Sequence, residues 1–374
     1  MRQQDGENLN LIAIDGRELE GKPTGVGNYL LNILEALELH PDRRVLIFFK
    51  NEIPPQPLPR FEPVLLRSNK KNLPWLHTVL APELQRRKVR LFFSPTPNCA
   101  PLFHGIQVTV VYDLSYFSHP EWFSPRERWV RRISTRYAVH KADRVYVISD
   151  HVRTELIDRF KTPDRKLMIT PIAVHEKKVD PELRGALRSS YRYESEKIVL
   201  YVGSIFQRRH LPVLIQALAL LEPDVKLVVI GENRTFPYVD LKQIATQFAV
   251  DSRVVWLEYA SSKTVEDYYR MADVFVYLST YEGFGIPPLE AMSYGVPVVL
   301  SRTPAMDQIY QHSALFVPDI TARSVADSIR ACLNDLPLRE QLIESGFAQV
   351  ERSRWSDTAK MISNDWEQLL AARN

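Results

Sequence analysis

The sequence has few cysteines and no long apolar segment. Its two cysteines, Cys99 and Cys332, are 233 positions apart in a chain of 374 residues, a separation that suits neither a disulfide framework nor a metal-ligand cluster. No apolar run approaches the ~18–20 residues that a transmembrane helix needs. The residues after Met1 are acidic and polar, unlike those of a secretory signal peptide. We therefore expect a soluble protein of a reducing, cytoplasmic compartment.

Several familiar ligand motifs are also missing, and each absence excludes a class of protein. Gly25-Val26-Gly27 could begin a dinucleotide fingerprint, but Leu30 stands where the third glycine is needed. No Lys-Ser/Thr pair follows in phosphate-loop spacing, and no nucleic-acid motif accompanies the basic residues. There is no Asp-x-Asp motif, so we expect neither a bound metal nor another cofactor.

Charge is distributed unevenly along the chain. Residues 1–172 contain 26 Lys and Arg against 19 Asp and Glu, whereas residues 173–374 contain 22 against 26. Part of the positive excess lies between Arg126 and Arg144, and a second basic patch covers residues 86–90. Two interpretations remain open: a solvated helix face, or attraction to an anionic partner such as the inner face of a membrane or a lipid diphosphate.

Short apolar runs alternate with helical patterns in both halves of the chain, which predicts an α/β fold with parallel sheets. Runs such as 198–202 and 274–278 are apolar throughout, as in strands covered on both faces of a doubly wound sheet. We expect two Rossmann-like domains, because the length exceeds that of one compact core. The expected divisions are an N-terminal domain 1–172, a polar linker 173–196, a second domain 197–352 and a C-terminal helix 353–374.

The most informative segment joins an apolar strand to a helix. It contains a carboxylate on each side of a glycine-rich turn, in the order Glu282, Gly283, Phe284, Gly285, Ile286 and, one helical turn on, Glu290. The glycines let the backbone expose N–H groups, and the N-terminus of the following helix can hold phosphate. The carboxylates can accept hydrogen bonds from sugar hydroxyls. The alternative is a solvated loop glutamate and a helix-surface glutamate.

Four further segments accompany this turn: residues 24–29 (TGVGNY), 111–116 (VYDLSY), 119–123 (HPEWF) and 202–209 (VGSIFQRR). With the Glu-x7-Glu spacing of 282–290, they resemble the retaining glycosyltransferases of family 4, in particular mannosyltransferase-like members. The resemblance spans nearly the whole chain. It implies the GT-B fold, in which two Rossmann-like domains face across a cleft and a C-terminal helix crosses back to the first domain.

The resemblance also implies roles for individual residues. Arg208 and Arg209 would clamp the donor diphosphate, since a guanidinium meets phosphate oxygens bidentately and stays charged. Donor binding would further involve Ser204, the turn 283–286 and Glu290, while Glu282 would be a catalytic residue. A glycine loop would line the acceptor or phosphate side, made of Gly25, Val26, Gly27 and Asn28.

The main departure from the family pattern is Tyr112. A histidine commonly ends this strand in the family and hydrogen-bonds the transferred sugar, whereas a tyrosine titrates near ~10. Either Tyr112 takes over this contact, or Asp113 or His119 does, and Asp113 is the preferred polar contact. Arg209 stands where the family usually has lysine, which keeps the charge.

These observations favour transfer of a hexose, with mannose from GDP-mannose as the first candidate, to a saccharide or lipid-linked acceptor in bacterial cell-surface polysaccharide synthesis. The donor is a GDP- or UDP-sugar, and nucleic acid is not an expected partner. Two alternatives stay open: a catalytically weak nucleotide-sugar-binding protein, given Tyr112, and a sugar-nucleotide epimerase of the same fold. The basic N-terminal domain adds the expectation of a peripheral membrane contact.

Overall fold

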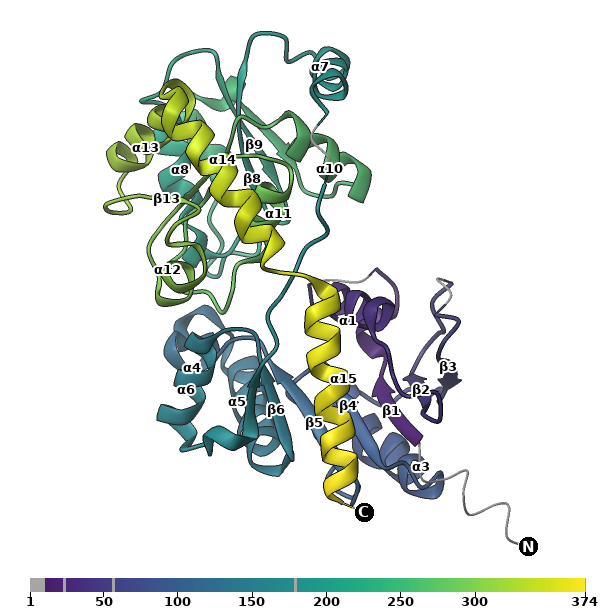
Figure 1. Ribbon diagram of the computed structural model, residues 1–374. Coiled ribbons are helices and arrows are strands. Elements are labelled where there is room, and N and C mark those ends of the chain that lie inside the picture. The colour runs from purple at the N-terminus through teal and green to yellow at the C-terminus, as the bar shows by residue number, and fades with distance from the viewer. Residues whose placement is uncertain (1–10, 23–24, 56–57, 178–179, 374) are drawn as a thin grey trace, which may run out of the picture. The chain divides into compact units, whose positions relative to one another are not determined.

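A computed structural model describes residues 11–22, 25–55, 58–177 and 180–373 (Figure 1). The acidic N-terminal segment, the first two residues of the strand that the sequence predicts over 9–14, and Thr24 lie outside the described residues. The chain divides into two compact units. Unit 1 comprises residues 1–120, 124–172 and 355–374, and unit 2 comprises residues 121–123 and 173–354.

Unit 1 is built on a seven-stranded parallel sheet in the order β3-β2-β1-β4-β5-β6-β7. Its strands are β1 (Leu11–Asp15), β2 (Arg44–Phe49), β3 (Glu62–Leu65), β4 (Leu91–Ser94), β5 (Ile106–Val111), β6 (Arg144–Val147) and β7 (Leu167–Ile169). Its helices before the C-terminal one are α1 (Gly25–Ala36), α2 (Asn72–Trp75), a π-helical turn (Leu76–Leu80), α3 (Ala81–Arg86), α4 (Ser115–Ser118), α5 (Pro125–Lys141) and α6 (Asp150–Phe160). Every residue of β1, β4 and β5 is buried, as expected where helices cover both faces of a sheet.

Unit 2 repeats this plan with a six-stranded parallel sheet in the order β10-β9-β8-β11-β12-β13. Its strands are β8 (Lys197–Val202), β9 (Val225–Ile230), β10 (Val254–Leu257), β11 (Val274–Tyr277), β12 (Val298–Leu300) and β13 (Leu315–Phe316). Its helices are α7 (Pro181–Ser190), α8 (Leu211–Leu218), α9 (Leu241–Gln247), α10 (Ser262–Met271), α11 (Ile286–Ser293), α12 (Pro304–Tyr310), α13 (Ala322–Asn334) and α14 (Leu336–Glu351). The two parallel sheets confirm the predicted α/β class with two Rossmann-like domains.

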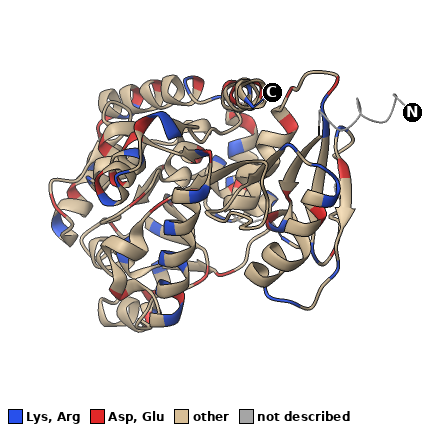
Figure 2. Ribbon diagram, turned by 90° about the horizontal axis from the view of Figure 1, so that it is seen from below, with Lys and Arg blue, Asp and Glu red and all other residues tan. Residues whose placement is uncertain are grey.

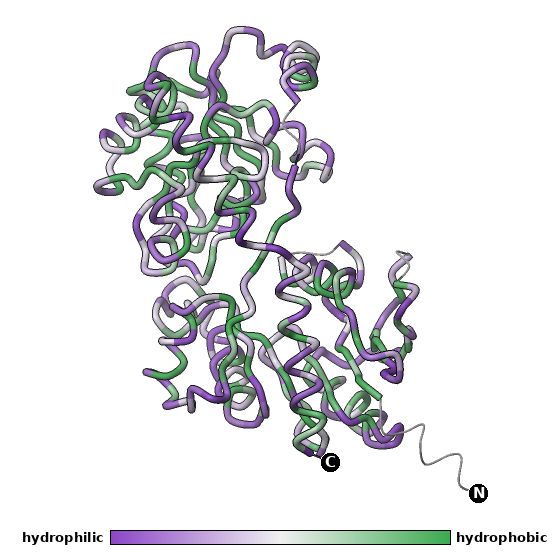
Figure 3. The backbone as a smooth tube through the Cα atoms, in the orientation of Figure 1, coloured by the Kyte–Doolittle hydropathy of each residue, from purple (hydrophilic) through white to green (hydrophobic). Residues whose placement is uncertain are grey.

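Local sequence explains where many of these elements begin. Asp180 and Asp240 each accept two backbone N–H groups of the helical turn that follows, and Asp335 accepts one, which satisfies donors that have no partner within the helix. Charged residues lie mainly on the helices and loops (Figure 2), and hydrophobic residues are concentrated in the interior of each unit (Figure 3). No helix of the described residues is both long and apolar enough to cross a bilayer.

The C-terminal helix α15 (Trp355–Ala372) belongs to unit 1, so the chain passes from unit 1 to unit 2 and back. The indole of Trp366 is buried and packs against Phe93 with ring centroids 5.4 Å apart. Asp365 pairs with Arg144 at 2.8 Å and accepts a 2.8 Å hydrogen bond from the hydroxyl of Tyr146. This is the crossing helix that the sequence predicted.

The segment expected to be a linker, residues 173–196, contains the helix α7. Arg184 and Arg188 of this helix pair with Asp273, at the start of β11, at 2.6 and 3.1 Å. These ion pairs attach the helix to unit 2, with which the segment groups. The extended connection is therefore shorter than the sequence suggested.

Candidate active site

Two arginines and one glutamate from separate turns of unit 2 meet at the carboxyl ends of its central strands. Arg208 and Arg209 lie in a 3₁₀ turn (Gln207–Arg209) that follows β8, and Glu282 lies in the turn after β11. Arg209 Nη2 is 3.0 Å from Glu282 Oε1, and Arg208 Nε is 3.8 Å from the same oxygen. All three side chains are about nine-tenths buried, with exposed fractions of 12%, 10% and 8%. The sequence named all three, and the fold brings them together.

Neighbouring groups fix this cluster. The hydroxyl of Ser279 donates to Glu282 Oε1 at 2.7 Å, and the N–H of Thr280 donates to the carbonyl of Arg208 at 3.1 Å. The guanidinium of Arg209 lies over the ring of Tyr277, 4.1 Å from its centroid. Two guanidinium groups therefore share one carboxylate, which leaves the cluster with one net positive charge available to an anion.

The turn between Glu282 and α11 requires glycine at position 285. Gly285 has φ of +86°, and a Cβ there would lie 2.3 Å from Met306 Cε. The hydroxyl of Tyr310 donates to the Gly285 carbonyl at 2.7 Å. Pro287 and Pro288 have no N–H, so Gly285 and Ile286 are the only residues at the start of α11 that can offer backbone donors to a ligand.

Glu290 has surroundings unlike those of Glu282. The hydroxyl of Tyr269 donates to Glu290 Oε2 at 2.9 Å. Burial raises the pKa of Glu290 above its ordinary value, an effect that the Tyr269 hydrogen bond and the charge of Lys177 oppose. A hydrogen-bond donor on a bound ligand would favour the ionised form further.

The end of β8 lies very close to the end of β9. Gly203 and Gly231 have φ of +133° and +145°, and a Cβ on Gly231 would lie 2.1 Å from the Gly203 carbonyl oxygen. Next to this contact, the Ser204 carbonyl accepts a 3.2 Å hydrogen bond from the Tyr201 hydroxyl. The two glycines thus set the backbone around Ser204, a predicted donor contact.

In unit 1, Tyr112 follows the last residue of β5 and packs edge-on against Tyr29 of α1, with ring centroids 5.4 Å apart. Its hydroxyl is buried and has no hydrogen-bond partner among the described residues. Burial raises the pKa of Tyr112 well above its ordinary value, so the hydroxyl keeps its proton. A buried donor of this kind is costly unless a partner arrives.

Two predicted site segments of unit 1 lie at the starts of helices. Gly25, Val26, Gly27 and Asn28 form the first turn of α1 and not a loop. Asp113 Oδ1 accepts hydrogen bonds from the N–H and the hydroxyl of Ser115, at 3.0 and 2.7 Å, and so helps to begin α4. One carboxylate oxygen of Asp113 is therefore already hydrogen-bonded within the protein.

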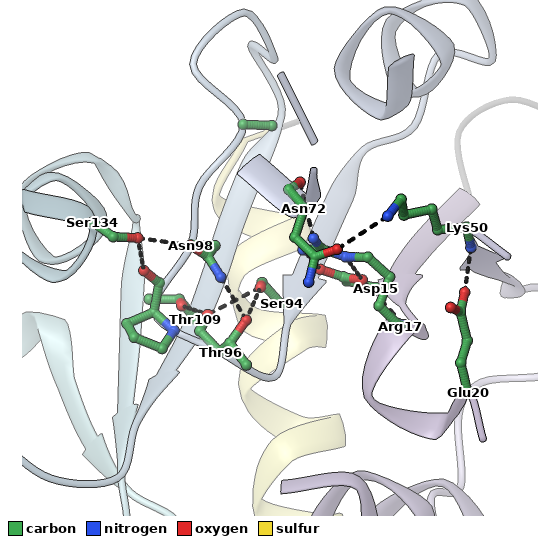
Figure 4. A network of polar contacts seen from close by, with 12 residues as sticks. Asp15, Arg17, Glu20, Lys50, Asn72, Ser94, Thr96, Asn98, Thr109 and Ser134 are labelled. Atoms are coloured by element: carbon green, nitrogen blue, oxygen red, sulfur yellow. Dashed lines mark hydrogen bonds and ion pairs between the residues drawn. The ribbon is translucent and has the colours of Figure 1, made fainter. Parts of the chain in front are cut away.

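A polar network that the sequence did not predict lies at the carboxyl ends of β1 and β4 (Figure 4). Arg17 donates to both oxygens of Asp15, at 2.9 and 2.5 Å, and to the carbonyl of Asn72 at 3.0 Å. Asn98 donates to Thr96 Oγ1 at 2.7 Å. The available signal was Asp15-Gly-Arg17 directly after an apolar strand, where open α/β sheets bind their ligands.

Comparison with known proteins identifies the family. A model described as "Glycosyltransferase Family 4" matches residues 23–178, and one described as "Glycosyl transferases group 1" matches residues 186–349. The chain belongs to the family 4 glycosyltransferases. The glycosyltransferase is 26% identical to the O-antigen chain mannosyltransferase B of Escherichia coli over 70% of each chain. It is 28% identical to an alpha-D-kanosaminyltransferase of Streptomyces kanamyceticus over 63% of its own length and 61% of that enzyme.

Solved structures share the fold of this glycosyltransferase at low sequence identity. A sucrose-phosphate synthase from Thermosynechococcus elongatus has a TM-score of 0.79 and 19% identity, covering 97% of this chain and 100% of that one. The Anabaena protein HepE, solved in complex with UDP and glucose, has a TM-score of 0.76 and 18% identity, covering 96% and 99%. These likenesses confirm the GT-B fold.

Proposed function

We propose that this glycosyltransferase transfers a hexose, mannose first among the candidates, from a nucleotide sugar to a saccharide or lipid-linked acceptor with retention at the anomeric carbon. The observation that carries the proposal is the cluster of Arg208, Arg209 and Glu282 beside the glycine turn that opens α11. The mannosyltransferase relative supports the choice of sugar. Its O-antigen role supports an acceptor in cell-surface polysaccharide synthesis.

In the proposed reaction, the diphosphate lies against Arg208 and Arg209, whose charges stabilise the negative charge that grows as the nucleotide leaves. The backbone N–H groups of Gly285 and Ile286 assist at the start of α11. Glu290 accepts hydrogen bonds from donor hydroxyls, and Glu282 holds the arginines in place. No protein nucleophile is required if the acceptor attacks on the face that the nucleotide leaves, so the main contribution is positioning.

We also propose that transfer is independent of metal ions, since the two guanidinium groups can supply the charge stabilisation. Activity measured before and after treatment with EDTA tests this. The rate should stay within about twofold, because no catalytic charge is removed. Loss of activity that Mg²⁺ or Mn²⁺ restores would contradict the proposal.

The deciding experiment pairs binding with product analysis. GDP-mannose and UDP-glucose are titrated against the enzyme and against Glu290→Ala, with Glu344→Ala of α14 as the control because Glu344 is exposed. Loss of the Glu290 contacts should weaken donor binding by about 5- to 150-fold, equivalent to ~1–3 kcal/mol. An unchanged Kd would place the donor elsewhere.

Product analysis by NMR then separates the alternatives. Transfer predicts an acceptor-dependent glycoside with the anomeric configuration of the donor. An epimerase would change the sugar nucleotide without an acceptor, and a catalytically weak binding protein would bind the donor and form no product.

A further inference from the structure

The large apolar side chains of helix α5 in unit 1 are exposed to solvent. A helix that only packs onto a sheet would bury such side chains against the sheet. The buried residues of α5 are small or short: Thr135, Ala138 and Val139. Its large apolar residues are exposed, with exposed fractions of 65% for Trp129 and 48% for Ile133. Val130 and Tyr137, at 37% and 38%, are also exposed.

These exposed residues form one surface. At 3.6 residues per turn, Trp129, Val130, Ile133 and Tyr137 fall within a stripe about 100° wide, centred near Ile133. A contiguous exposed apolar surface on a water-soluble domain indicates an interaction site.

Cations line the same stripe. Arg126, Arg136 and Lys141 are exposed and fall within about 80° of Ile133 around the helix. The one acidic residue of α5, Glu127, pairs with Arg131 at 2.8 Å. The exposed face therefore combines apolar side chains with uncompensated positive charge.

The other basic residues between Arg126 and Arg144 differ from those of this face, because they make contacts within unit 1. Arg132 donates to the carbonyls of Tyr116 and Phe117, at 2.8 and 3.2 Å, and Arg144 pairs with Asp365. These arginines hold unit 1 together. Arg126, Arg136 and Lys141 lie on the exposed stripe. Their side chains make no such hydrogen bond or ion pair with the residues that the structure describes.

We propose that the exposed face of α5 docks this enzyme onto an anionic membrane surface, with Trp129 and Ile133 inserted at the level of the lipid headgroups. Trp and Tyr suit this level because one end of each is apolar and the other polar. Lys and Arg at the border of the stripe can reach lipid phosphates while their stems cover apolar surface. The surface goes beyond the proposed reaction, and it would hold the enzyme where a lipid-linked acceptor is found.

A vesicle-binding assay tests the proposal without any turnover, so its outcome is independent of the donor assignment. The full chain is sedimented with vesicles of phosphatidylcholine alone, or with about a third phosphatidylglycerol. We expect binding only to the anionic vesicles, weakening as salt rises, since each Lys or Arg near such a surface contributes about a fivefold factor in affinity. Brominated lipids should quench part of the tryptophan fluorescence, and Trp129→Gln should abolish that quenching.

Matched variants locate the surface. Trp129→Gln with Ile133→Gln, and separately Arg126→Ser with Arg136→Ser, should each lower vesicle binding at least tenfold. Leu336→Gln and Arg323→Ser should leave it unchanged, because Leu336 and Arg323 are at least as exposed as Trp129 but lie in unit 2. Melting temperatures confirm that each variant is folded.

Three outcomes would overturn the proposal. The first is vesicle binding by the α5 variants equal to that of the unaltered enzyme. The second is a change in sedimentation coefficient on Trp129→Gln without vesicle binding, which would make the face a contact between copies. The third is competition for the face by single-stranded nucleic acid with no binding to anionic vesicles.

Discussion

Tyr112 presents a donor that the protein does not use. Its hydroxyl is buried against α1 and has no partner among the described residues, although the ring packs well on Tyr29. If the transferred sugar supplies the partner, Tyr112→Phe should lower kcat by at least tenfold while the melting temperature stays constant or rises. Steady-state kinetics and thermal denaturation of the same preparation measure both.

Tyr116→Phe provides the matched control for this prediction. The Tyr116 hydroxyl is bonded to Thr135 Oγ1 at 2.6 Å, so its removal should cost about 1 kcal/mol of stability and leave kcat unchanged. Tyr112→His restores the group that the family commonly has and should retain turnover. A Tyr112→Phe rate within twofold of the unaltered enzyme would favour Asp113 as the sugar contact.

Glu282 is the counter-ion of two buried guanidinium groups. Glu282→Gln keeps the shape of the side chain but leaves Arg208 and Arg209 without their carboxylate, and breaking a buried pair typically costs ~3–5 kcal/mol. We therefore expect a melting temperature lower by more than 5 °C. Added nucleoside diphosphate should recover more of this loss in the variant than it adds to the unaltered enzyme, because the phosphates replace the missing charge.

Calorimetry with and without GDP or UDP measures this effect. Glu351→Gln is the control, since Glu351 is an exposed residue at the end of α14. A destabilised Glu282→Gln enzyme that no nucleotide rescues would show that the arginines do not face the diphosphate.

At the scale of the elements, the sequence predicts every strand of unit 2 and the central strands of unit 1, but it misses the two edge strands of unit 1. β8 and β11 are continuous apolar runs, and only strands buried on both faces need such runs. The missed strands are short edge strands: β3 contains Pro63 and β7 has three residues. Their pairing depends on a neighbouring strand, which local sequence does not encode.

The candidate site was likewise predicted only in part from the sequence. Arg208 and Arg209 were predictable through the resemblance of residues 202–209 to the family, and Glu282 because a glycine turn at the end of an apolar strand marks the ligand edge of an α/β sheet. Their ion pair was not, since it joins turns 73 residues apart. Residues 25–28 were named a glycine loop through the resemblance, but they form the first turn of α1, because the tertiary packing of Tyr29 overrides the low helix propensity of Gly25 and Gly27.

The turns after β8 and β9 allow an element-scale prediction. Gly231→Ala would place a methyl group 2.1 Å from the Gly203 carbonyl oxygen at a residue with φ of +145°, so we expect a loss of more than 2 kcal/mol of stability. Gly185→Ala is the matched control, because position 185 is an exposed helical site with nothing within 4 Å of the added Cβ. It should raise stability by ~0.5–1 kcal/mol. Chemical denaturation measures both, and equal effects would contradict the close approach of the two turns.

At the scale of the whole molecule, unit 1 depends on residues that follow unit 2. Trp366 is fully buried on Phe93, and truncation of such a residue typically costs ~3–5 kcal/mol. Trp366→Ala should therefore destabilise unit 1, detected as faster proteolysis within residues 11–172. Turnover should fall more than donor affinity, because the proposed contacts to the donor diphosphate and Glu290 lie in unit 2, whereas Tyr112, the proposed contact to the transferred sugar, lies in unit 1.

Met361→Ala, on the exposed side of the same helix, serves as the control and should be neutral. If Trp366→Ala weakens donor binding as strongly as turnover, donor binding depends on unit 1 as much as catalysis does, which would contradict this prediction.

The return of α15 to unit 1 has a consequence for biosynthesis. A ribosome that has completed the strands of unit 1 must still translate the whole of residues 173–354 before α15 emerges. At ~5–20 residues per second this takes roughly 10–40 s. During that time Phe93 and Tyr146, buried in the finished protein, lack the helix that covers them. The nascent first half is thus a natural client for a chaperone, and the second half, although made later, is the first that can finish folding.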